Sequence, residues 1–376
     1  MKNAYLGIIN RYRKYLPVDD NTPVVTLYEG NTALIEAKNI SKKLFNNAVR
    51  VFLKCEGFNP TGSFKDRGMT LAISKAVEEG SKAVICASTG NTSASAAAYS
   101  AVAGLKCAVL IPSGAIALGK LSQALMHGAV VVPVDGNFDV ALTMVREIVK
   151  KYPLTLVNSL NPYRIEGQKT GAFEIVDFLT SYIDEGVNIF PDYQFMPVGN
   201  AGNITAYWKG YKEYQKLFGL PITQLPKMMG YQAAGSAPIV IGKPVEKPET
   251  LATAIRIGNP ASWKQAVDAR DESGGVIEAV TDDEIVEAYK LLAGSEGVFC
   301  EPASAASVAG LIKKSKDGYF KAVPEKQRGK KKSVPIAVCI LTGHGLKDPE
   351  RAIKSTAVDL KPVKPDIDAI IKAIGL

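Results

Sequence analysis

Short apolar runs alternate with stretches of helical periodicity along most of this chain, and this alternation constrains the fold more than any other feature. Eight runs rich in apolar residues are candidate strands, at residues 51–55, 83–88, 107–112, 130–134, 154–158, 194–199, 227–232 and 334–341. Between them, residues 118–128, 138–152 and 170–183 repeat apolar residues at helical spacing. Strands that are apolar throughout and separated by helices form parallel sheets covered on both faces. The sequence therefore predicts an α/β protein.

The alternation thins between residues 235 and 275, where several prolines interrupt the pattern. A long irregular connection of this kind is usually functional or lies at a domain edge. The length of 376 residues is sufficient for two domains with sizeable cores.

The composition argues against several functional classes. No apolar run approaches the roughly 20 residues of a membrane span, and the first residues do not resemble a signal peptide. The five cysteines are odd in number, widely spaced and mostly in apolar runs, which predicts buried free thiols in a reducing cytosol. With two histidines and no CxxC pair, we expect no metal site. The net charge of +8 comes with no aromatic platform or nucleic-acid motif, so we expect a solvated surface and no nucleic-acid partner.

The stretch 59-NPTGSFKDRG-68 places Lys65 behind a run of turn residues, at the expected start of a helix. A lysine is slightly disfavoured there because the N-terminal end of the helix dipole is positive. The same environment favours the neutral amine, which is a nucleophile. The alternative interpretation is a solvated surface charge.

The turn 88-STGNTSAS-95 follows a candidate strand and leads into a helix of small residues. Capping a helix needs one polar side chain, whereas this turn has six within eight residues. We therefore favour a site for an anion or a carboxylate over capping alone.

Two further turns follow candidate strands. In 199-GNAGN-203, glycines let backbone N–H groups approach a phosphate at the start of an amphipathic helix, although such a turn is a weak signal by itself. The turn 342-TGHG-345 leaves the Thr342 hydroxyl at the carboxyl end of a buried strand. An ordinary tight turn is the alternative there, and His344 between two glycines is interpreted as a turn residue.

A lysine nucleophile, a phosphate-binding turn and a strand-end hydroxyl together match the needs of pyridoxal phosphate. That cofactor requires a lysine for a Schiff base, a cradle for its phosphate and a partner for its ring nitrogen.

In this order and spacing, SFKDRG, STGNTSAS, GNAGN and LTGHGLKDP closely resemble the motifs of the threonine synthase family of the short bacterial and archaeal type, from about Val51 to Pro349. The resemblance implies fold type II of the pyridoxal phosphate enzymes, as in tryptophan synthase β, with two domains of mostly parallel open sheets covered by helices. Residues 1–65 and 160–376 would form the larger domain. Residues 66–159 would form a smaller mobile domain, and the cofactor would lie between the two. A cytoplasmic homodimer is also expected.

The resemblance further implies a role for each matching residue. Lys65 would bind the cofactor covalently and then move protons. The ring would contact Asn91 at its 3′-oxygen and Thr342 at its nitrogen, and a neutral hydroxyl at that position should leave the nitrogen largely unprotonated. The residues implied to hold the cofactor phosphate are Gly199, Asn200, Ala201, Gly202 and Asn203.

The implied substrate is O-phospho-L-homoserine, which would be converted with water to L-threonine and phosphate by γ-elimination and β-addition. A second anion site must then bind the substrate phosphate, and the planar donor fork of Arg164 suits it. From the residues alone, a surface ion pair is an equally good interpretation of this arginine. The resemblance places Asn158, Ser159, Arg164 and Asn200 at the substrate phosphate, and Ser88, Thr89 and Thr92 at the carboxylate or phosphate end.

Two alternative functions remain open from the sequence. A threonine or serine dehydratase of the same fold needs no second phosphate site, so Arg164 with Ser159 is the distinguishing feature. A non-catalytic ligand-binding protein would have no need of Lys65. The stretch 300-CEPASAAS-307 also resembles a wall beside the cofactor ring, and only Glu301 is of interest there because helix packing explains the small residues equally well.

Overall fold

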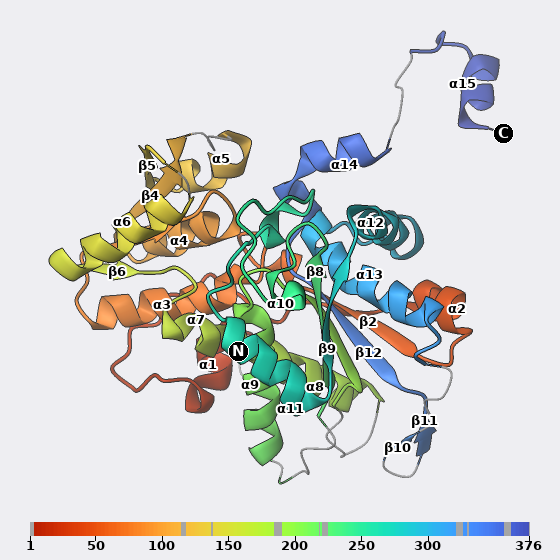
Figure 1. The fold of residues 1–376 in the computed structure, drawn as a ribbon, viewed down its shortest axis with the longest axis horizontal. Helices are drawn as coiled ribbons and strands as arrows, with labels where there is room; N and C mark the ends of the chain where they lie inside the picture. The colour runs from red at the N-terminus through yellow and green to blue at the C-terminus, as the bar shows by residue number, and fades with distance from the viewer. Residues whose placement is uncertain are drawn as a thin grey trace.

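Two sheets form the centre of the molecule in this computed structural model, and helices pack on both (Figure 1). The structure describes residues 4–113, 118–136, 138–183, 190–217, 219, 225–320, 326–328, 331–356 and 362–375. Within these residues, no helix is both long and apolar enough to cross a bilayer.

The larger sheet has six strands, and every neighbouring pair is parallel except β1–β2. Its order is β1 (Leu34–Glu36), β2 (Arg50–Cys55), β12 (Ile336–Leu341), β7 (Tyr193–Pro197), β8 (Lys227–Ala233) and β9 (Val276–Val280). The smaller sheet has four parallel strands in the order β5 (Val130–Val134), β4 (Lys106–Pro112), β3 (Ala83–Ala87) and β6 (Leu154–Leu156). The predicted α/β class with parallel sheets is confirmed.

The central strand β12 shows why these runs are apolar throughout. Ile336, Val338 and Ile340 belong to the core on one face of the sheet, which also takes residues from α8 (Thr170–Ile183), α9 (Gly202–Leu217) and α11 (Trp263–Ser273). The alternate residues Ala337, Cys339 and Leu341 join the core of the other face, with residues from α2 (Lys38–Phe45), α12 (Asp282–Glu296) and α13 (Pro302–Lys316). Because side chains alternate along a strand, a strand buried on both faces has no polar period.

The smaller sheet is covered in the same way. Residues of α3 (Lys65–Glu78), α4 (Asn91–Val102) and α5 (Leu118–Met126) share one core with Val84 and Val109. Residues of α6 (Phe138–Lys151) pack against Ile85 and Leu110 on the other face. All five cysteines are buried and free, as predicted.

The remaining elements are short or lie outside the two sheets. They are α1 (Ile8–Tyr12), η1 (Arg13–Tyr15), η2 (Glu56–Phe58), α7 (Pro162–Gln168), α10 (Pro238–Ile241), η5 (Thr253–Ile255), β10 (Lys326–Arg328), β11 (Lys331–Ser333), η6 (Gly345–Lys347), α14 (Pro349–Thr356) and α15 (Ile367–Ile374).

The predicted elements differ from the structure in several places. The region predicted as irregular, 235–275, contains α10, η5 and the eleven-residue helix α11. Strands β1, β9, β10 and β11 were not predicted, because β1, β10 and β11 have three residues each and three of the five residues of β9 are only half-buried. The strand predicted at 154–158 ends at Leu156, since the side chain of Asn158 takes over the pairing with β3, accepting from Ala87 N and donating to Ala87 O at 2.9 Å each.

Candidate active site

Lys65 is the first residue of α3 and follows a turn that is held against the end of β12. Ser63 forms an isolated bridge with Gly343, and the backbone N–H of Phe64 donates to the carbonyl of Thr342 at 3.0 Å. The Lys65 amine lies 4.5 Å from the centre of the Phe64 ring. Burial and the nearby charge of Arg164 lower the pKa of Lys65 to about 7, against the opposing effect of Glu301. A large fraction of this amine is therefore neutral at neutral pH.

The two residues after Lys65 hold this turn in place. The buried carboxylate of Asp66 accepts hydrogen bonds from the Thr61 backbone at 2.7 Å, the Thr61 hydroxyl at 2.5 Å and the Ser95 hydroxyl at 2.6 Å. Asp66 thereby ties the turn to α4. Arg67 is fully buried and pairs with Glu56 at 2.7 Å and Glu174 at 2.6 Å. In the SFKDRG motif, the two charged residues after the lysine thus have structural partners.

The helix that carries Lys65 crosses α7 at very short range. A Cβ atom added to Gly68 would lie 2.7 Å from Nε of Arg164, and one added to Gly167 would overlap the carbonyl oxygen of Arg67. Glycine is required on both helices at this crossing, because any side chain would force them apart. The crossing places Arg164 beside the start of α3.

Arg164 is buried, with 1% of its surface exposed. Its Nη1 donates to the Val157 carbonyl at 2.8 Å, whereas Nε and Nη2 have no hydrogen-bond partner within the described part of the chain. Burial lowers the pKa of Arg164 to about 10. The surface ion pair considered from the sequence is wrong, because this guanidinium is buried. Buried donors without partners are costly, and an anionic ligand would satisfy them.

The other residues implied to bind the substrate phosphate are placed differently. The Nδ2 of Asn200 donates to the Ser159 hydroxyl, and its Oδ1 accepts from the Ala261 N–H at 2.6 Å. Ser159 follows β6 of the smaller sheet and Asn200 follows β7 of the larger sheet. The hydrogen bond between Asn200 and Ser159 therefore connects the two sheets. Both amide atoms of Asn158 are engaged by the backbone of Ala87, and the structure therefore gives that side chain a partner within the protein.

The turn 199–203 connects β7 to the N-terminus of α9. Gly199 packs so closely that an added Cβ would lie 2.9 Å from Cα of Ile255, and Ala201 takes a positive φ of 64°. In contrast, the nearest atom to a Cβ on Gly202 would be 3.4 Å away. The amide nitrogen and oxygen of Asn203 are both buried without a partner among the described residues. These groups fit a phosphate bound at the helix N-terminus.

The turn between β3 and α4 presents half-buried polar side chains. The hydroxyl of Ser88 accepts from the N–H of Gly90 at 3.2 Å, and Thr89 and Thr92 are half-buried beside it. Asn91, the first residue of α4, donates to Glu301 at 3.1 Å.

Thr342 lies directly after β12, as the sequence predicted. Its hydroxyl donates to Oε1 of Glu301 at 3.2 Å and lies 3.0 Å from the Ser304 hydroxyl. His344 Nδ1 accepts from the Leu346 N–H at 3.1 Å, which is a turn contact.

Glu301 is of only modest interest from the sequence, yet this carboxylate contacts both Asn91 and Thr342. The sequence feature that could have pointed to Glu301 is an acidic residue directly before a proline and a run of small residues.

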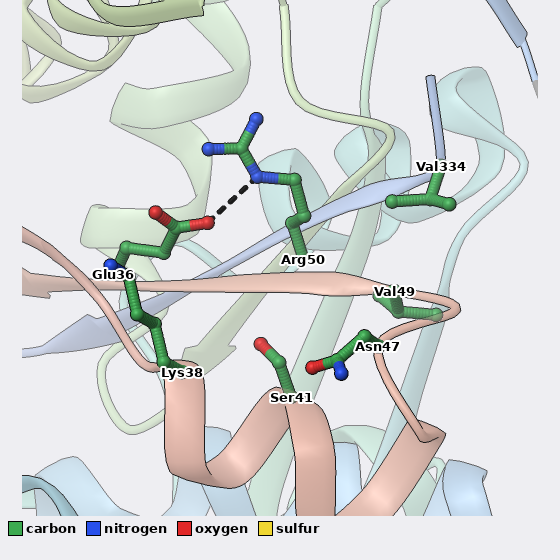
Figure 2. A pocket seen from close by; sticks show the side chains of 7 residues that line it. All are labelled: Glu36, Lys38, Ser41, Asn47, Val49, Arg50 and Val334. Atoms are coloured by element: carbon green, nitrogen blue, oxygen red, sulfur yellow. Dashed lines mark hydrogen bonds and ion pairs between the residues drawn. The ribbon is translucent and has the colours of Figure 1, made fainter. Parts of the chain in front are cut away.

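A surface cavity of about 340 Å³ lies away from this site, between α2 and the start of β2 (Figure 2). Its Arg50 pairs with Glu36 at 2.8 Å. Arg50 begins β2 and the candidate site follows the other end of that strand, about 17 Å away at the usual rise per residue.

Comparison with known proteins identifies the family. Residues 25–323 match the family described as "Pyridoxal-phosphate dependent enzyme". The chain belongs to this family. Within it, the chain is 58% identical to a threonine synthase from Synechocystis sp. over 98% of its own length and 91% of that protein. It is 51% identical to a threonine synthase from Methanocaldococcus jannaschii, covering 95% of this chain and 84% of the relative. It therefore belongs to the threonine synthases.

Solved structures show the same fold at low sequence identity. The processed form of threonine deaminase isoform 2 from Solanum lycopersicum has a TM-score of 0.70 at 21% identity, covering 88% of this chain and 84% of that one. A cysteine synthase from Entamoeba histolytica has a TM-score of 0.70 at 18% identity, covering 96% and 99%. The fold is thus that of the fold-type II pyridoxal phosphate enzymes.

The residues present in this pyridoxal phosphate enzyme fit its cofactor. The amine of Lys65 is suited to a Schiff base because its pKa is lowered. The Asn203 amide, which has no partner among the described residues, and the looser packing at Gly202, where an added Cβ would make only ordinary van der Waals contact, fit a phosphate. Asn91 at the start of α4 and Thr342 directly after β12 provide polar atoms that both contact the Glu301 carboxylate.

Proposed function

We propose that this chain is a threonine synthase that converts O-phospho-L-homoserine and water to L-threonine and phosphate. The observation that carries the proposal is the buried guanidinium of Arg164, which has two nitrogens without a partner among the described residues and whose charge is close enough to Lys65 to lower the pKa of that lysine. A second phosphate besides that of the cofactor satisfies these donors. The identity of 51–58% to threonine synthases over nearly the whole chain supports the same conclusion.

In this proposal each residue has a defined task. Bound pyridoxal phosphate supplies an electron sink for negative charge that develops next to the substrate's α carbon. The neutral Lys65 amine takes the proton from the α carbon, gives that proton up within the site and only then takes a proton from the β carbon; a proton returns to the α carbon when water has added at the β carbon. Arg164, Ser159 and Asn200 bind the substrate phosphate and stabilise it as it leaves. The hydroxyls that orient the substrate carboxylate or phosphate end are those of Ser88, Thr89 and Thr92.

We further propose that the two sheets mark two domains, the larger from residues 1–65 and 160–376 and the smaller from 66–159. Three side-chain pairs support a site between them: Asn91 with Glu301, Ser159 with Asn200, and Gln123 of α5 with Lys347 of η6. Movement of the smaller domain would admit substrate and then exclude water until it is needed.

A cytoplasmic homodimer completes the proposal. The five free, buried thiols support a reducing compartment. Sedimentation of the purified protein at several concentrations tests the dimer, and a monomer at all concentrations would contradict it.

The decisive experiment is product analysis with purified protein, pyridoxal phosphate and O-phospho-L-homoserine. We expect threonine and inorganic phosphate in equal amounts, and neither product from Lys65→Ala. For Arg164→Gln we expect kcat/KM to fall at least about 100-fold, because two charge-assisted hydrogen bonds are lost at about 1.5–3 kcal/mol each. The exposed Lys264→Gln serves as the control.

Two outcomes would replace the proposal. Conversion of threonine or serine to an oxo acid, without phosphate release from O-phospho-L-homoserine, would indicate a dehydratase. Binding of the cofactor and substrate with no reaction would indicate a ligand-binding protein.

A further inference from the structure

Glu301 is a buried carboxylate that the proposed reaction does not yet use. It occupies the position before the first residue of α13, with 4% of its surface exposed, but its side chain does not cap that helix. It forms no ion pair shorter than 4 Å within the described residues, although Lys65 of α3 and Lys347 of η6 act on it electrostatically. A buried carboxylate without an ion pair must be held by hydrogen bonds.

Those hydrogen bonds come from two elements, the first residue of α4 and the residue directly after β12. Asn91 Nδ2 donates to Oε2 at 3.1 Å and approaches Oε1 at 3.4 Å, while the Thr342 hydroxyl donates to Oε1 at 3.2 Å. A Cβ added to Gly343 would lie 2.5–2.8 Å from the carboxylate atoms of Glu301. The glycine after Thr342 therefore makes room for this carboxylate.

The number of protons on each hydroxyl determines which group donates and which accepts in these hydrogen bonds. A threonine hydroxyl has one proton to donate and two lone pairs. The Thr342 proton goes to the carboxylate, which can only accept when it is ionised. The Ser304 hydroxyl accepts from the Gly343 N–H at 2.9 Å, and its own proton is directed to Thr342 at 3.0 Å or to the Gly343 carbonyl at 3.3 Å. As long as Glu301 is ionised, Thr342 keeps a lone pair but has no proton for a ligand.

We propose that Glu301 is a positioning residue of this active site: its carboxylate holds the Asn91 amide and the Thr342 hydroxyl together at the cofactor site. This role rests on the proposed cofactor binding but not on the identity of the substrate.

The arrangement also depends on pH. Burial raises the pKa of the Glu301 carboxyl, and its hydrogen bonds from Asn91 and Thr342 and the charges of Lys347 and Lys65 lower it in part. The Cys300 thiol, next in the chain, adds no charge near neutral pH because burial raises its pKa. When Glu301 takes up a proton at low pH, it can donate to Thr342, and the Thr342 proton becomes free for a ligand.

The test is a titration of cofactor-free protein with pyridoxal phosphate, followed by the absorbance of the bound cofactor between pH 6 and 9. A glutamine at 301 replaces one carboxylate oxygen with an NH2 group, which cannot accept, so the two oxygen positions cannot both accept from Asn91 and Thr342 as they do in Glu301. For Glu301→Gln we expect the dissociation constant to rise about tenfold, the effect of about 1.4 kcal/mol, and the pH profile of the absorbance to change. Glu301→Asp keeps the charge but is shorter, and we expect an intermediate dissociation constant with the wild-type pH profile.

A second readout needs no cofactor. In the cofactor-free protein, Glu301→Gln should increase hydrogen exchange in the first turn of α4, where Asn91 loses its acceptor, and leave the interior of α13 unchanged. The control is Glu287→Gln, which removes an exposed carboxylate on α12 that pairs with Lys316. We expect the control to match the wild type in every measurement.

The results separate this proposal from the proposed reaction. If the wild type binds pyridoxal phosphate but forms no threonine, the proposed reaction fails and the Glu301 variants still test the positioning role. If Glu301→Gln folds and binds the cofactor within twofold of the wild type with the same pH profile, the positioning role is overturned. If that variant does not fold, Glu301→Asp decides: a changed pH profile together with wild-type affinity would overturn the proposal.

Discussion

At the residue scale, the chemistry of Lys65 comes from its surroundings more than from its own structure. Burial and Arg164 lower the pKa of its amine from 10.5 to about 7. The unfolded chain would keep the ordinary value, so the folded and unfolded states bind different numbers of protons between these two pH values. Reactivity at this position is therefore obtained at the expense of stability.

We predict that Lys65→Met stabilises the cofactor-free protein at pH 7. Between pH 7 and 10.5 the unfolded lysine is protonated more than the folded one, so the stability of the wild type rises with pH across this range. Because a tenfold change in a protonation equilibrium corresponds to about 1.4 kcal/mol, we expect the variant to be at least that much more stable at pH 7 and the difference to shrink by pH 10. Urea unfolding at both pH values measures this. The exposed Lys264→Met is the control, and a difference for Lys65→Met that stays constant with pH would contradict the argument.

At the scale of elements, the crossing of α3 and α7 brings a base and an anion-binding residue together. Each helix contributes a glycine at the contact, Gly68 and Gly167, and no other residue fits at this separation. The positions of Lys65 and Arg164 relative to each other depend on this close contact, since each is only a few residues from the crossing.

We predict that Gly167→Ala destabilises the protein by about 1–3 kcal/mol, the usual cost of overpacking. It should also lower kcat/KM, because the added methyl group pushes Arg164 away from Lys65. The matched control is Gly294→Ala in α12, where an added Cβ meets nothing within 4 Å. That exchange should stabilise the protein by about 0.5–1 kcal/mol, through the higher helix propensity of alanine, without affecting activity. Equal effects of the two substitutions would rule out the crossing as the cause.

At the scale of the whole molecule, a buried group of four charges joins distant parts of the chain. Lys54 of β2 pairs with Glu174 of α8 at 2.8 Å, and Arg67 of α3 pairs with both Glu174 and Glu56 of η2. The N-terminal segment adds the backbone N–H of Asn31, which donates to Glu174 at 2.7 Å. This group connects the helix that carries Lys65 to the larger sheet.

We predict that Glu174→Gln costs about 3–5 kcal/mol at pH 7, because it leaves buried positive charges without their partner. Burial alone would raise the pKa of Glu174, but Arg67 and Lys54 hold it well below its usual range. Its contribution is thus present above the unfolded pKa of about 4.3 and is lost as the pH falls toward the lower folded value. Stability measured from pH 7 to pH 2 should fall less steeply in the variant. Glu147→Gln at the exposed pair with Lys150 should leave the profile nearly unchanged, and parallel profiles for wild type and Glu174→Gln would contradict the prediction.

The sequence by itself determined the α/β class, because strands buried on both faces must be apolar throughout, as β12 shows. It also predicted which turns follow strands, since the 88–95 turn, the 199–203 turn and Thr342 are marked by local residue types, and it placed Lys65 at the start of a helix. The roles assigned to these residues remain predictions. Strand β1 was not predicted because it is short, strand β9 because it is half-buried, and helix α11 because it lies near several prolines.

Only the tertiary structure decided which of these residues meet. Arg164 is buried by the packing of segments that are distant in the chain. Residues distant in the chain also meet in two sets of hydrogen bonds, those between Asn158 and the Ala87 backbone and those of Glu301 with Asn91 and Thr342. A sequence pattern reports the local preference of each segment, whereas desolvation and hydrogen-bond partners depend on which segments the fold brings together. For that reason the pKa of Lys65 and the position of Glu301 follow from packing and not from either motif alone.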